Sequence, residues 1–441
     1  MTTVEAFVAA NRFGMGPLPG GLAGIAPDPQ GWLLRQLGSS DGALPYLRGL
    51  PRSRDVLAEF LRLRKDRDAR KIFRKERAGP LYREEAARRT LAAIKTDTPF
   101  RERLVQFWGN HFTASVTKGQ IRPLVGAFER EAIRPHVTGR FADMLIAVAR
   151  HPAMLIYLDN VASIGPNSRA GQRRKRGLNE NLAREILELH TLGVDGGYQQ
   201  SDVIALAKIL TGWAFGNARR GNPGDFTFFD PRHEPGDKRL LGRTYAEDGV
   251  REGEAALRAL AVHPSTARFV ATKLARHFIA DDPPQGAIDR LRRTFLDSKG
   301  DLGAVSRALV ALPYAWRAPL AKVKTPNDLI VSAFRLLGPP SKEKRVLAPL
   351  RLLGQLPFFA PSPAGWPDKE ESWIGPESLL RRIEILELLS KRRTVGTDPR
   401  RLAEEAFGPV ASADTVAAIR RAASGQEALA LVLSSPEFQR R

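Results

Sequence analysis

Apolar residues recur at three- and four-residue spacing along most of the chain, which is the pattern of amphipathic helices. The pattern predicts helices over residues 54–75, 86–107, 124–138, 140–150, 180–192, 201–213, 253–262, 264–279, 284–298, 302–312, 326–337, 347–353, 376–390, 399–407, 412–424 and 425–433. Several of these segments begin at Pro or Ser and end at Gly, as capped helices do. The sequence therefore predicts an all-α protein.

Strand signals are scarce along the chain. The one candidate is DFTFF at residues 225–229, which we expect to pair with residues 238–241 as a small hairpin. Because no linker of distinct composition divides the chain, we expect a single helical domain over 1–441. Its core should lie over 86–340, with a C-terminal helical segment at 376–441 packed on it. Residues 359–375, with two Trp and several Pro, should cross the surface as an extended segment.

Composition narrows the class of protein. Of the 441 residues, 43% are hydrophobic and 27% are charged, as is typical of a globular chain. The absence of cysteine excludes thiolate metal sites, a cysteine nucleophile and disulfides. No run of about 18 apolar residues occurs, so no membrane span is expected. The N-terminus lacks the features of an export signal, so we expect a cytoplasmic protein.

The formal net charge of +21 has two interpretations. It favours a polyanionic partner such as nucleic acid or an anionic membrane face, and it would also follow from an Arg-rich coding bias. Acids are interleaved with the basic residues at 62–79, and no aromatic residues alternate with them as base stacking requires. Nucleic-acid binding is therefore the less favoured interpretation. It predicts that the arginines of 62–77 and 169–176 gather on one face.

The segment from residue 178 to residue 213 concentrates candidate chemistry. On its first predicted helix, one face carries Asn181, Arg184, Glu185 and Glu188. The opposite, apolar face carries Leu182, Ile186 and Leu189. His190 lies on neither face and should point sideways in the last turn, where the helix C-terminus favours a protonated ring.

Two interpretations of this polar face stay open. In the first, Glu185 and Glu188 supply oxygen ligands or an acid–base pair, while Arg184 holds an anionic group. In the second, the same side chains form a buried network that fixes the packing of the helix. Structural ion pairs imitate catalytic sites closely, so the sequence does not separate the two.

Histidines supply the other candidates. His111 ends a predicted helix, where it could face a cleft or cap exposed carbonyl groups. His233 lies in the long loop over 215–242, and its loop position favours a functional role. The nearby Lys238 could bind an anion or could be solvated. Three others are expected to be structural, namely His151 and His263 as helix caps before Pro, and His277 in the core.

A metal site would have to be assembled from separate segments. HExxH does not occur, and Glu188 is followed three residues later by Thr191 rather than by His. The candidate ligands are His111, His190 and His233 with Glu185 or Glu188. Such a mixed N/O set suits a divalent metal, namely zinc, iron or manganese. Walker A, Rossmann GxGxxG and GxSxG motifs are absent, which argues against nucleotide, nicotinamide and common hydrolase chemistry.

Long blocks of the sequence resemble one bacterial family. They are ANRFG at 10–14, FWGNHF at 107–112, HPAMLIYLDN at 151–160, NENLAREILELHTLGV at 179–194, DVIALAKILTGW at 202–213, FDPRH at 229–233, HPSTARFVATKLARHF at 263–278, KVKTPNDLI at 322–330 and LGQLPFFAPSPAGWP at 353–367. With these blocks in this order, the chain resembles the family catalogued as domain of unknown function eighteen hundred. The resemblance implies a mostly helical protein, commonly encoded beside a sulfatase-like family, without a settled activity.

Three functional hypotheses follow. The first is an enzyme with a His/Glu site, which predicts a deep polar pocket where the helix at 180–190, His111 and the loop at 225–242 converge. The second is a non-catalytic partner or scaffold for the sulfatase-like protein encoded nearby. It predicts that the same residues are salt-bridged and closed to solvent, with an exposed apolar patch elsewhere. The third is binding of nucleic acid or of an anionic surface.

Overall fold

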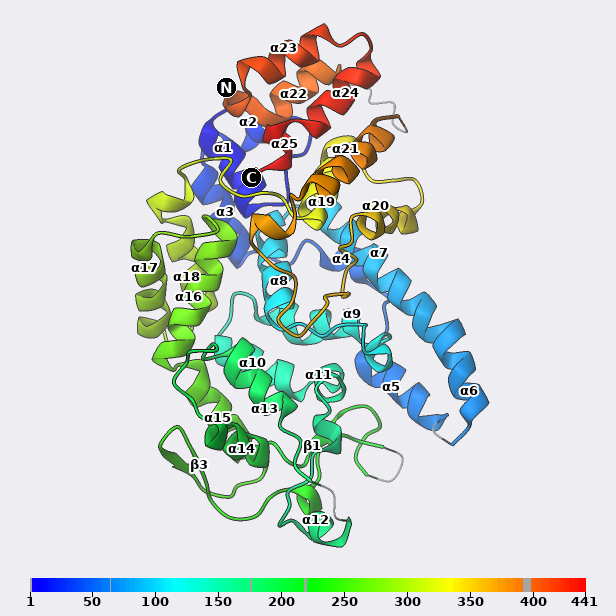
Figure 1. Ribbon diagram of the computed structural model, residues 1–441, viewed down its shortest axis with the longest axis vertical. Coiled ribbons are helices and arrows are strands. Elements are labelled where there is room, and N and C mark those ends of the chain that lie inside the picture. Colours follow the sequence, from blue (N-terminus) through cyan, green and yellow to red (C-terminus); the bar gives the residue numbers. More distant parts are fainter. Residues whose placement is uncertain (1, 64, 175–176, 218–219, 392–397) are drawn as a thin grey trace.

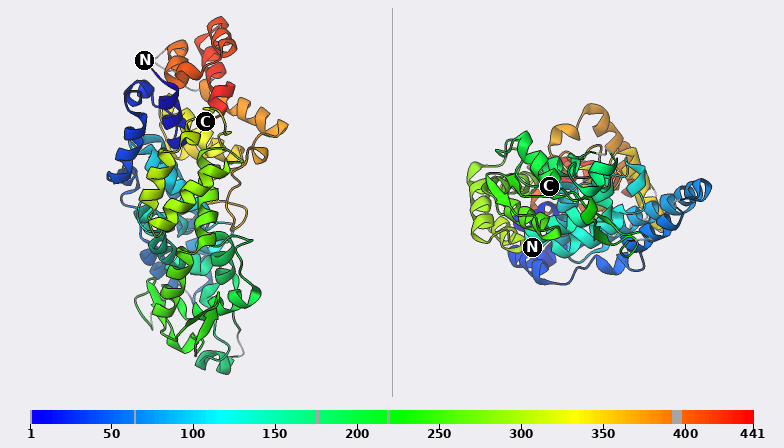
Figure 2. Two further views of the ribbon diagram at one scale, coloured as in Figure 1. Left: turned by 90° about the vertical axis from the view of Figure 1, so that its left-hand side faces the viewer. Right: turned by 90° about the horizontal axis from the view of Figure 1, so that it is seen from below.

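The computed structural model describes residues 2–63, 65–174, 177–217, 220–391 and 398–441. Within these ranges helices dominate, and the sheets are two short antiparallel hairpins. The predicted all-α fold with a small β excursion is therefore confirmed. The molecule is elongated, and both termini lie towards the same end (Figures 1 and 2). None of the helices described in these ranges has the length and apolar composition to span a membrane.

The helices follow one another with short connections. The first half of the chain contains α1 (Val4–Val8), α2 (Gly21–Ile25), α3 (Pro29–Gly38), α4 (Leu44–Leu47), α5 (Ser53–Arg62), α6 (Arg67–Ile72), α7 (Gly79–Lys95), α8 (Pro99–His111), α9 (Val125–Phe128), α10 (Phe141–Arg150), α11 (Pro152–Tyr157), α12 (Arg169–Arg174), α13 (Asn181–Glu185) and α14 (Gln200–Ile209). The second half contains α15 (Val250–Ala261), α16 (Pro264–Phe278), α17 (Gln285–Asp297), α18 (Leu302–Val310), α19 (Pro326–Leu337), α20 (Leu347–Leu352), α21 (Pro376–Lys391), α22 (Pro399–Phe407), α23 (Ala413–Arg421), α24 (Gly425–Ser434) and α25 (Pro436–Gln439).

Shorter helical turns complete several of these helices. Turns of π-helix span Ala9–Phe13, Phe73–Ala78, Glu129–Ile133 and Ile186–His190. Turns of 3₁₀-helix span Gly119–Ile121, Arg134–His136, Asn160–Ala162, Asp230–Arg232, Pro313–Ala315, Glu343–Val346, Glu370–Ser372 and Gly408–Val410. The expected caps are present, since the His151 and His263 rings accept hydrogen bonds from the backbone N–H groups at the starts of α11 and α16.

Apolar side chains from both ends of the sequence share core clusters. The largest cluster extends from Ala6 to Ala315 along the chain. In a second cluster, Phe7 of α1 and Leu329 of α19 pack with residues of the C-terminal helices α22 and α24. These contacts place the N-terminal and C-terminal helices beside α19, as Figure 1 shows.

Two helices predicted as continuous are interrupted. The prediction over 54–75 corresponds to α5 and α6, which are separate helices, and the prediction over 86–107 breaks between α7 and α8. The second break lies at Thr96–Thr98, directly before Pro99. Proline lacks an N–H donor and disfavours helical geometry in the residue before it, so one helix ends here and another begins. Apolar spacing continued across the break and concealed it.

The predicted pairing of 225–229 with 238–241 is wrong. Instead β2 (Phe226–Phe228) pairs with β1 (Trp213–Phe215), and β3 (Lys238–Leu240) pairs with β4 (Arg243–Tyr245). The two-residue turn between β3 and β4 has positive φ at Leu241 (48°) and at Gly242 (77°). Positive φ at both central residues is the geometry of the tight turns that close two-residue hairpins. Leucine is an unusual residue for such a turn, which is why the sequence did not reveal this hairpin.

The segment over 355–372 is irregular apart from the 3₁₀ turn at Glu370–Ser372, and hydrogen bonds to its backbone hold it against the helices. The Tyr82 hydroxyl donates to the Pro357 carbonyl at 3.0 Å, and the Val116 N–H donates to the Phe358 carbonyl at 2.9 Å. Farther along, the Asn110 amide donates to the Trp366 carbonyl at 2.9 Å and accepts from the Trp366 N–H at 2.7 Å. These bonds fix the segment as one wall of the cavity described below.

Candidate functional site

Four segments that are distant in sequence form most of the wall of a cavity of about 360 Å³, to which Arg89 and Glu129 also contribute. They are the C-terminal part of α8, the C-terminal part of α16, the start of α19 and the irregular segment over 355–372. Each of the four coincides with one of the sequence blocks that carry the family resemblance. A volume of this size lies at the lower end of the range for small-molecule sites.

A histidine and an aspartate meet in the wall of this cavity. The His277 ring, on α16, has its Nδ1 atom 3.1 Å from Oδ2 of Asp368 and 3.2 Å from Oδ1. Because a carboxylate only accepts, Nδ1 carries the proton and Nε2 of the neutral ring keeps its lone pair. Among the described residues this buried Nε2 atom has no hydrogen-bond partner. The pair is an imidazole oriented by a carboxylate, with a buried nitrogen without a partner, on a residue of the cavity wall.

The electrostatics of the pair keep the imidazole neutral and the carboxylate charged. Burial lowers the pKa of His277, and Asp368 opposes this effect. Burial alone would raise the pKa of Asp368, but His277 and Lys322 hold it well below its usual value. The Lys322 ammonium also donates to the Asp368 carbonyl at 2.6 Å, and to Asp281 at 2.5 Å. Asp368 is thus fixed from two sides.

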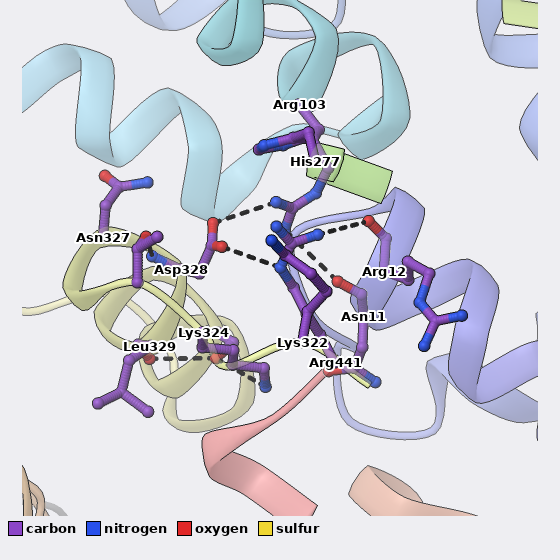
Figure 3. A network of polar contacts seen from close by, with 12 residues as sticks. Asn11, Arg12, Arg103, His277, Lys322, Lys324, Asn327, Asp328, Leu329 and Arg441 are labelled. Atoms are coloured by element: carbon purple, nitrogen blue, oxygen red, sulfur yellow. Dashed lines mark hydrogen bonds and ion pairs between the residues drawn. The ribbon is translucent and has the colours of Figure 1, made fainter. Parts of the chain in front are cut away.

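Next to the pair lies a buried network centred on Asp328 (Figure 3). Arg103 approaches one carboxylate oxygen of Asp328 at 3.2 Å, and Arg441 approaches the other at 3.2 Å. Burial raises the pKa of Asp328, but the two guanidinium groups outweigh burial and lower it to about 2. Arg103 also donates through Nε to the Gly14 carbonyl at 2.6 Å. One carboxylate therefore joins α8 and α19 to the last residue of the chain.

Further cations surround this network. Lys324 is 2% exposed, and its ammonium donates to Ser332 Oγ at 3.2 Å and lies 4.3 Å from the centre of the Phe438 ring. Burial lowers the pKa of Lys324 to about 7. Arg12 is fully buried, and its guanidinium donates to backbone carbonyl groups of residues 315–318. The region beneath the cavity is therefore rich in buried positive charge.

Of the residues predicted for the site, His111 lines this cavity. Its Nε2 atom donates to the His190 carbonyl at 3.1 Å, so its Nδ1 is an acceptor without a partner among the described residues. His190 itself is buried beside His111, and burial lowers its pKa to about 3. The expectation of a protonated, sideways His190 is wrong. The π-turn with i→i+5 geometry rotates each residue less than an α-turn, and this brings His190 onto the buried face of Leu182 and Ile186.

The polar face of the same helix does not line the cavity. Arg184 forms an ion pair with Glu180 at 2.9 Å and a hydrogen bond with Gln200 at 2.9 Å on the surface. Glu185 is half-buried, and burial together with the neighbouring Glu188 raises its pKa to about 6. This face therefore has a surface ion pair and one carboxyl group that protonates easily.

His233 and Lys238 lie in a separate, closed network. Nε2 of His233 is 2.9 Å from Oε2 of Glu252, and the Lys238 ammonium is 3.1 Å from the same oxygen. The three side chains are at most 3% exposed. Nδ1 of His233 lies 2.9 Å from the Thr211 carbonyl, to which it donates. Without solvent access, this arrangement is typical of a packing network.

The predicted metal ligands do not form one set. Among the residues that the structure describes, no group of three or more His, Cys, Asp or Glu side chains is placed to hold a metal ion. His111 and His190 lie together, whereas His233 pairs with Glu252 elsewhere. The residues do not fit the proposed site, so no chemical step is assigned to a metal here. Metal content itself stays a prediction.

The sequence pattern places His277 in the core and gives no functional role to Asp368 or Lys273. A signal for the histidine was present, because Lys273, Arg276 and His277 recur at three- and four-residue spacing on α16. The apolar neighbours Leu274 and Phe278 concealed that polar stripe. No local signal pointed to Asp368, which lies 91 residues from His277 in the sequence.

Fold and cavity together define an all-helical protein with a charged cavity between its helices. The chain belongs to the DUF1800 family, since the family model described as "Protein of unknown function (DUF1800)" matches residues 8–440. The resemblance seen in the sequence is thereby confirmed. No curated protein and no solved structure gave a match to the chain.

Proposed function

We propose that this protein is an enzyme in which His277 moves a proton to or from a small molecule bound in the cavity. The observation that carries the proposal is the free Nε2 atom of His277, opposite an Nδ1–H that is held by Asp368. An imidazole with one nitrogen fixed by a carboxylate and the other without a hydrogen-bond partner has a lone pair that can accept a proton, as a general base does.

The steps assigned to these residues are limited to one proton. Nε2 of His277 accepts a proton from a hydroxyl group or a water held in the cavity, and the ring becomes an imidazolium. Asp368 keeps the ring in the productive tautomer and stabilises the imidazolium charge. Because burial lowers the pKa of His277, the base is unprotonated at neutral pH and ready to accept. The Asp328 network keeps the surrounding helices in place.

This proposal replaces the residues of the predicted His/Glu site but keeps its class. His111 is retained as a residue of the cavity wall, while Arg184, Glu185, Glu188, His233 and Lys238 are assigned no catalytic role. A dependence on zinc, iron or manganese is no part of the proposed proton transfer. Proton transfer by His277 is expected to contribute a factor of about 10² to 10⁴ in rate.

A second candidate is a non-catalytic partner for a sulfatase-like protein. The observation that favours it is a row of exposed apolar side chains on α21, namely Leu379, Leu380, Ile383 and Leu388. The binding of nucleic acid by basic side chains has weaker support. The two arginine-rich stretches are 62–77 and 169–176, of which residues 64, 175 and 176 lie outside the described residues. Figure 1 shows the helices of these stretches, α6 and α12, in different parts of the molecule.

The proposed function is tested by comparing variants on a mixed metabolite extract, with consumption and appearance of compounds followed by mass spectrometry. We expect the wild type and a His136→Gln control to change the same compound, and His277→Gln and Asp368→Asn to change it at least about 100-fold more slowly. The value of kcat/KM should decrease at acid pH with an apparent pKa below 6.5, which is the usual pKa of histidine. Equal rates for the wild type and His277→Gln, or no compound changed by the wild type, would contradict the proposal.

A further inference from the structure

Two cationic side chains of α16, Lys273 and Arg276, line the cavity together with His277. Lys273 is four residues before His277 and Arg276 is one residue before it. Residues spaced by three or four positions lie on one side of a helix, so Lys273 and His277 lie one above the other on α16. The helix thus offers two positive charges to whatever occupies the cavity.

These two cations lack the counterions that the other cations of the wall have. The paired cations of the wall are Arg89 with Glu129 at 2.6 Å, Arg103 with Asp328 at 3.2 Å, and Lys369 with Asp282 at 3.6 Å. Within the described part of the chain, neither Lys273 nor Arg276 forms an ion pair. The Lys273 ammonium lies 5.5 Å from the centre of the Phe269 ring, and Arg276 Nε donates to the Asp281 carbonyl at 3.2 Å.

The acidic residues of the wall are not available to these cations. Glu129, Asp328 and Asp368 each have a cationic or imidazole partner of their own, and Glu371 is exposed to solvent. The wall also contains an amide nitrogen, Nε2 of Gln106, that is buried and has no acceptor among the described residues. Unpaired positive charge and a free N–H donor in one cavity are unfavourable unless an acceptor is bound there.

Lys273 remains a cation at neutral pH. Burial lowers its pKa to about 8, and Asp368 opposes this effect. Because Lys273 is buried and forms no ion pair among the described residues, the protein alone compensates its charge poorly. An anion in the cavity would compensate it, because charge-assisted hydrogen bonds are roughly twice as strong as neutral ones.

We infer that the ligand of the cavity is a small molecule carrying an oxyanion, which Lys273 and Arg276 bind next to His277. The inference rests on the proposed function for the proton transfer, but the binding itself does not depend on it. Phosphate, sulfate and carboxylate share the chemistry that a lysine and an arginine recognise. The apolar part of the ligand would lie against Phe107, Phe358 and Trp366, which are the aromatic residues of the wall. The cavity of about 360 Å³ admits a small molecule rather than a chain.

The inference is tested by isothermal titration calorimetry of the full chain with inorganic phosphate, sodium sulfate and sodium acetate at constant ionic strength. We expect saturable binding of at least one anion by the wild type. The variants Lys273→Gln and Arg276→Gln should bind it about 10- to 100-fold more weakly, as expected for the loss of one charged hydrogen bond. Arg292→Gln, an exposed arginine of α17, is the matched control and should bind within about twofold of the wild type.

Two results would overturn the inference. One is the absence of saturable binding of all three anions by the wild type. The other is equal weakening by Arg292→Gln and the α16 variants, which would show a general surface effect. Circular dichroism verifies that each variant is folded, and having two α16 variants keeps the test decisive if one of them unfolds.

His277→Gln separates this inference from the proposed function. At pH 8 the His277 ring is neutral, so this variant should bind the anion within about threefold of the wild type while it loses turnover. If anion binding is found and His277→Gln turns over the substrate normally, the proposed function fails and the inference stands. If His277→Gln abolishes turnover and no anion binds, the inference fails and the proposed function stands.

Discussion

Replacing Asp328 by asparagine should strongly destabilise the protein. The change keeps the size of the side chain and removes the negative charge that Arg103 and Arg441 share at 3.2 Å. Lowering the pKa of Asp328 from 3.8 to about 2 corresponds to about 2.4 kcal/mol, at about 1.4 kcal/mol per pKa unit. The variant also leaves two buried guanidinium groups without a counterion, and breaking such a pair costs about 3 to 5 kcal/mol. We therefore expect a loss of about 3 to 5 kcal/mol in the free energy of unfolding.

The assay is urea unfolding at pH 7, followed by tryptophan fluorescence and by circular dichroism. Coincidence of the two transitions justifies a two-state free energy. The matched control is Asp289→Asn on α17, whose side chain is 41% exposed and lies 3.7 Å from Arg292. That exposed pair should contribute at most about 0.5 kcal/mol. A loss below about 1 kcal/mol in Asp328→Asn, or equal losses in the two variants, would refute the reasoning.

The pH dependence gives an independent readout of the same carboxylate. A carboxyl group whose pKa is lower in the folded state stabilises the fold above its unfolded pKa, and this stability is lost as the pH falls through the folded pKa. For Asp328 the window therefore runs from about pH 4 down to about pH 2. The wild type should lose stability across this window, and the difference between wild type and Asp328→Asn should shrink as the pH falls.

Three further predictions concern other parts of the chain. Glu252→Gln, which removes the charge shared by His233 and Lys238, should lower stability in urea by about 3 to 5 kcal/mol without changing anion binding. Glu185, with a pKa raised to about 6, binds more protons folded than unfolded, so the thermal stability of the wild type relative to Glu185→Gln should fall from pH 4.5 to pH 6. Gly365→Ala should lose at least about 1 kcal/mol and weaken anion binding in calorimetry, because φ is +88° and the added Cβ would lie 2.5 Å from a backbone oxygen of α8.

The elements of this fold follow from local patterns, which is why they were predictable. Helix α16 begins at Pro264 and ends at Phe278, close to the predicted 264–279, because a proline start and a regular apolar stripe are contained in the segment itself. The break before Pro99 was local as well, but the apolar spacing on its two sides matched by chance. A proline within a periodic stretch outweighs that spacing.

The cavity was not predictable in the same way, because it exists only through contacts between distant segments. Arg103 and Asp328 are 225 residues apart, and no spacing rule relates them. The prediction therefore favoured residues that are close in sequence, such as Glu185 and Glu188, and it placed His233 in a site because of its loop. In the structure His233 is buried against Glu252 and has no access to solvent. His277, which was expected in the core, lines a cavity.

The location of the buried charges bears on what the cavity does. Burying ion pairs seldom stabilises a protein more than well-packed apolar residues would, so a network such as Arg103–Asp328–Arg441 needs a reason beyond stability. Figure 3 shows the network beside His277, and the charges of Arg103 and Arg441 lower the pKa of the His277 ring. A lower pKa keeps the imidazole unprotonated at neutral pH, and the same positive charges oppose the imidazolium, so its stabilisation falls to Asp368. The network that joins α8, α19 and Arg441 therefore favours the neutral form of His277, which is the form that accepts a proton in the proposed function.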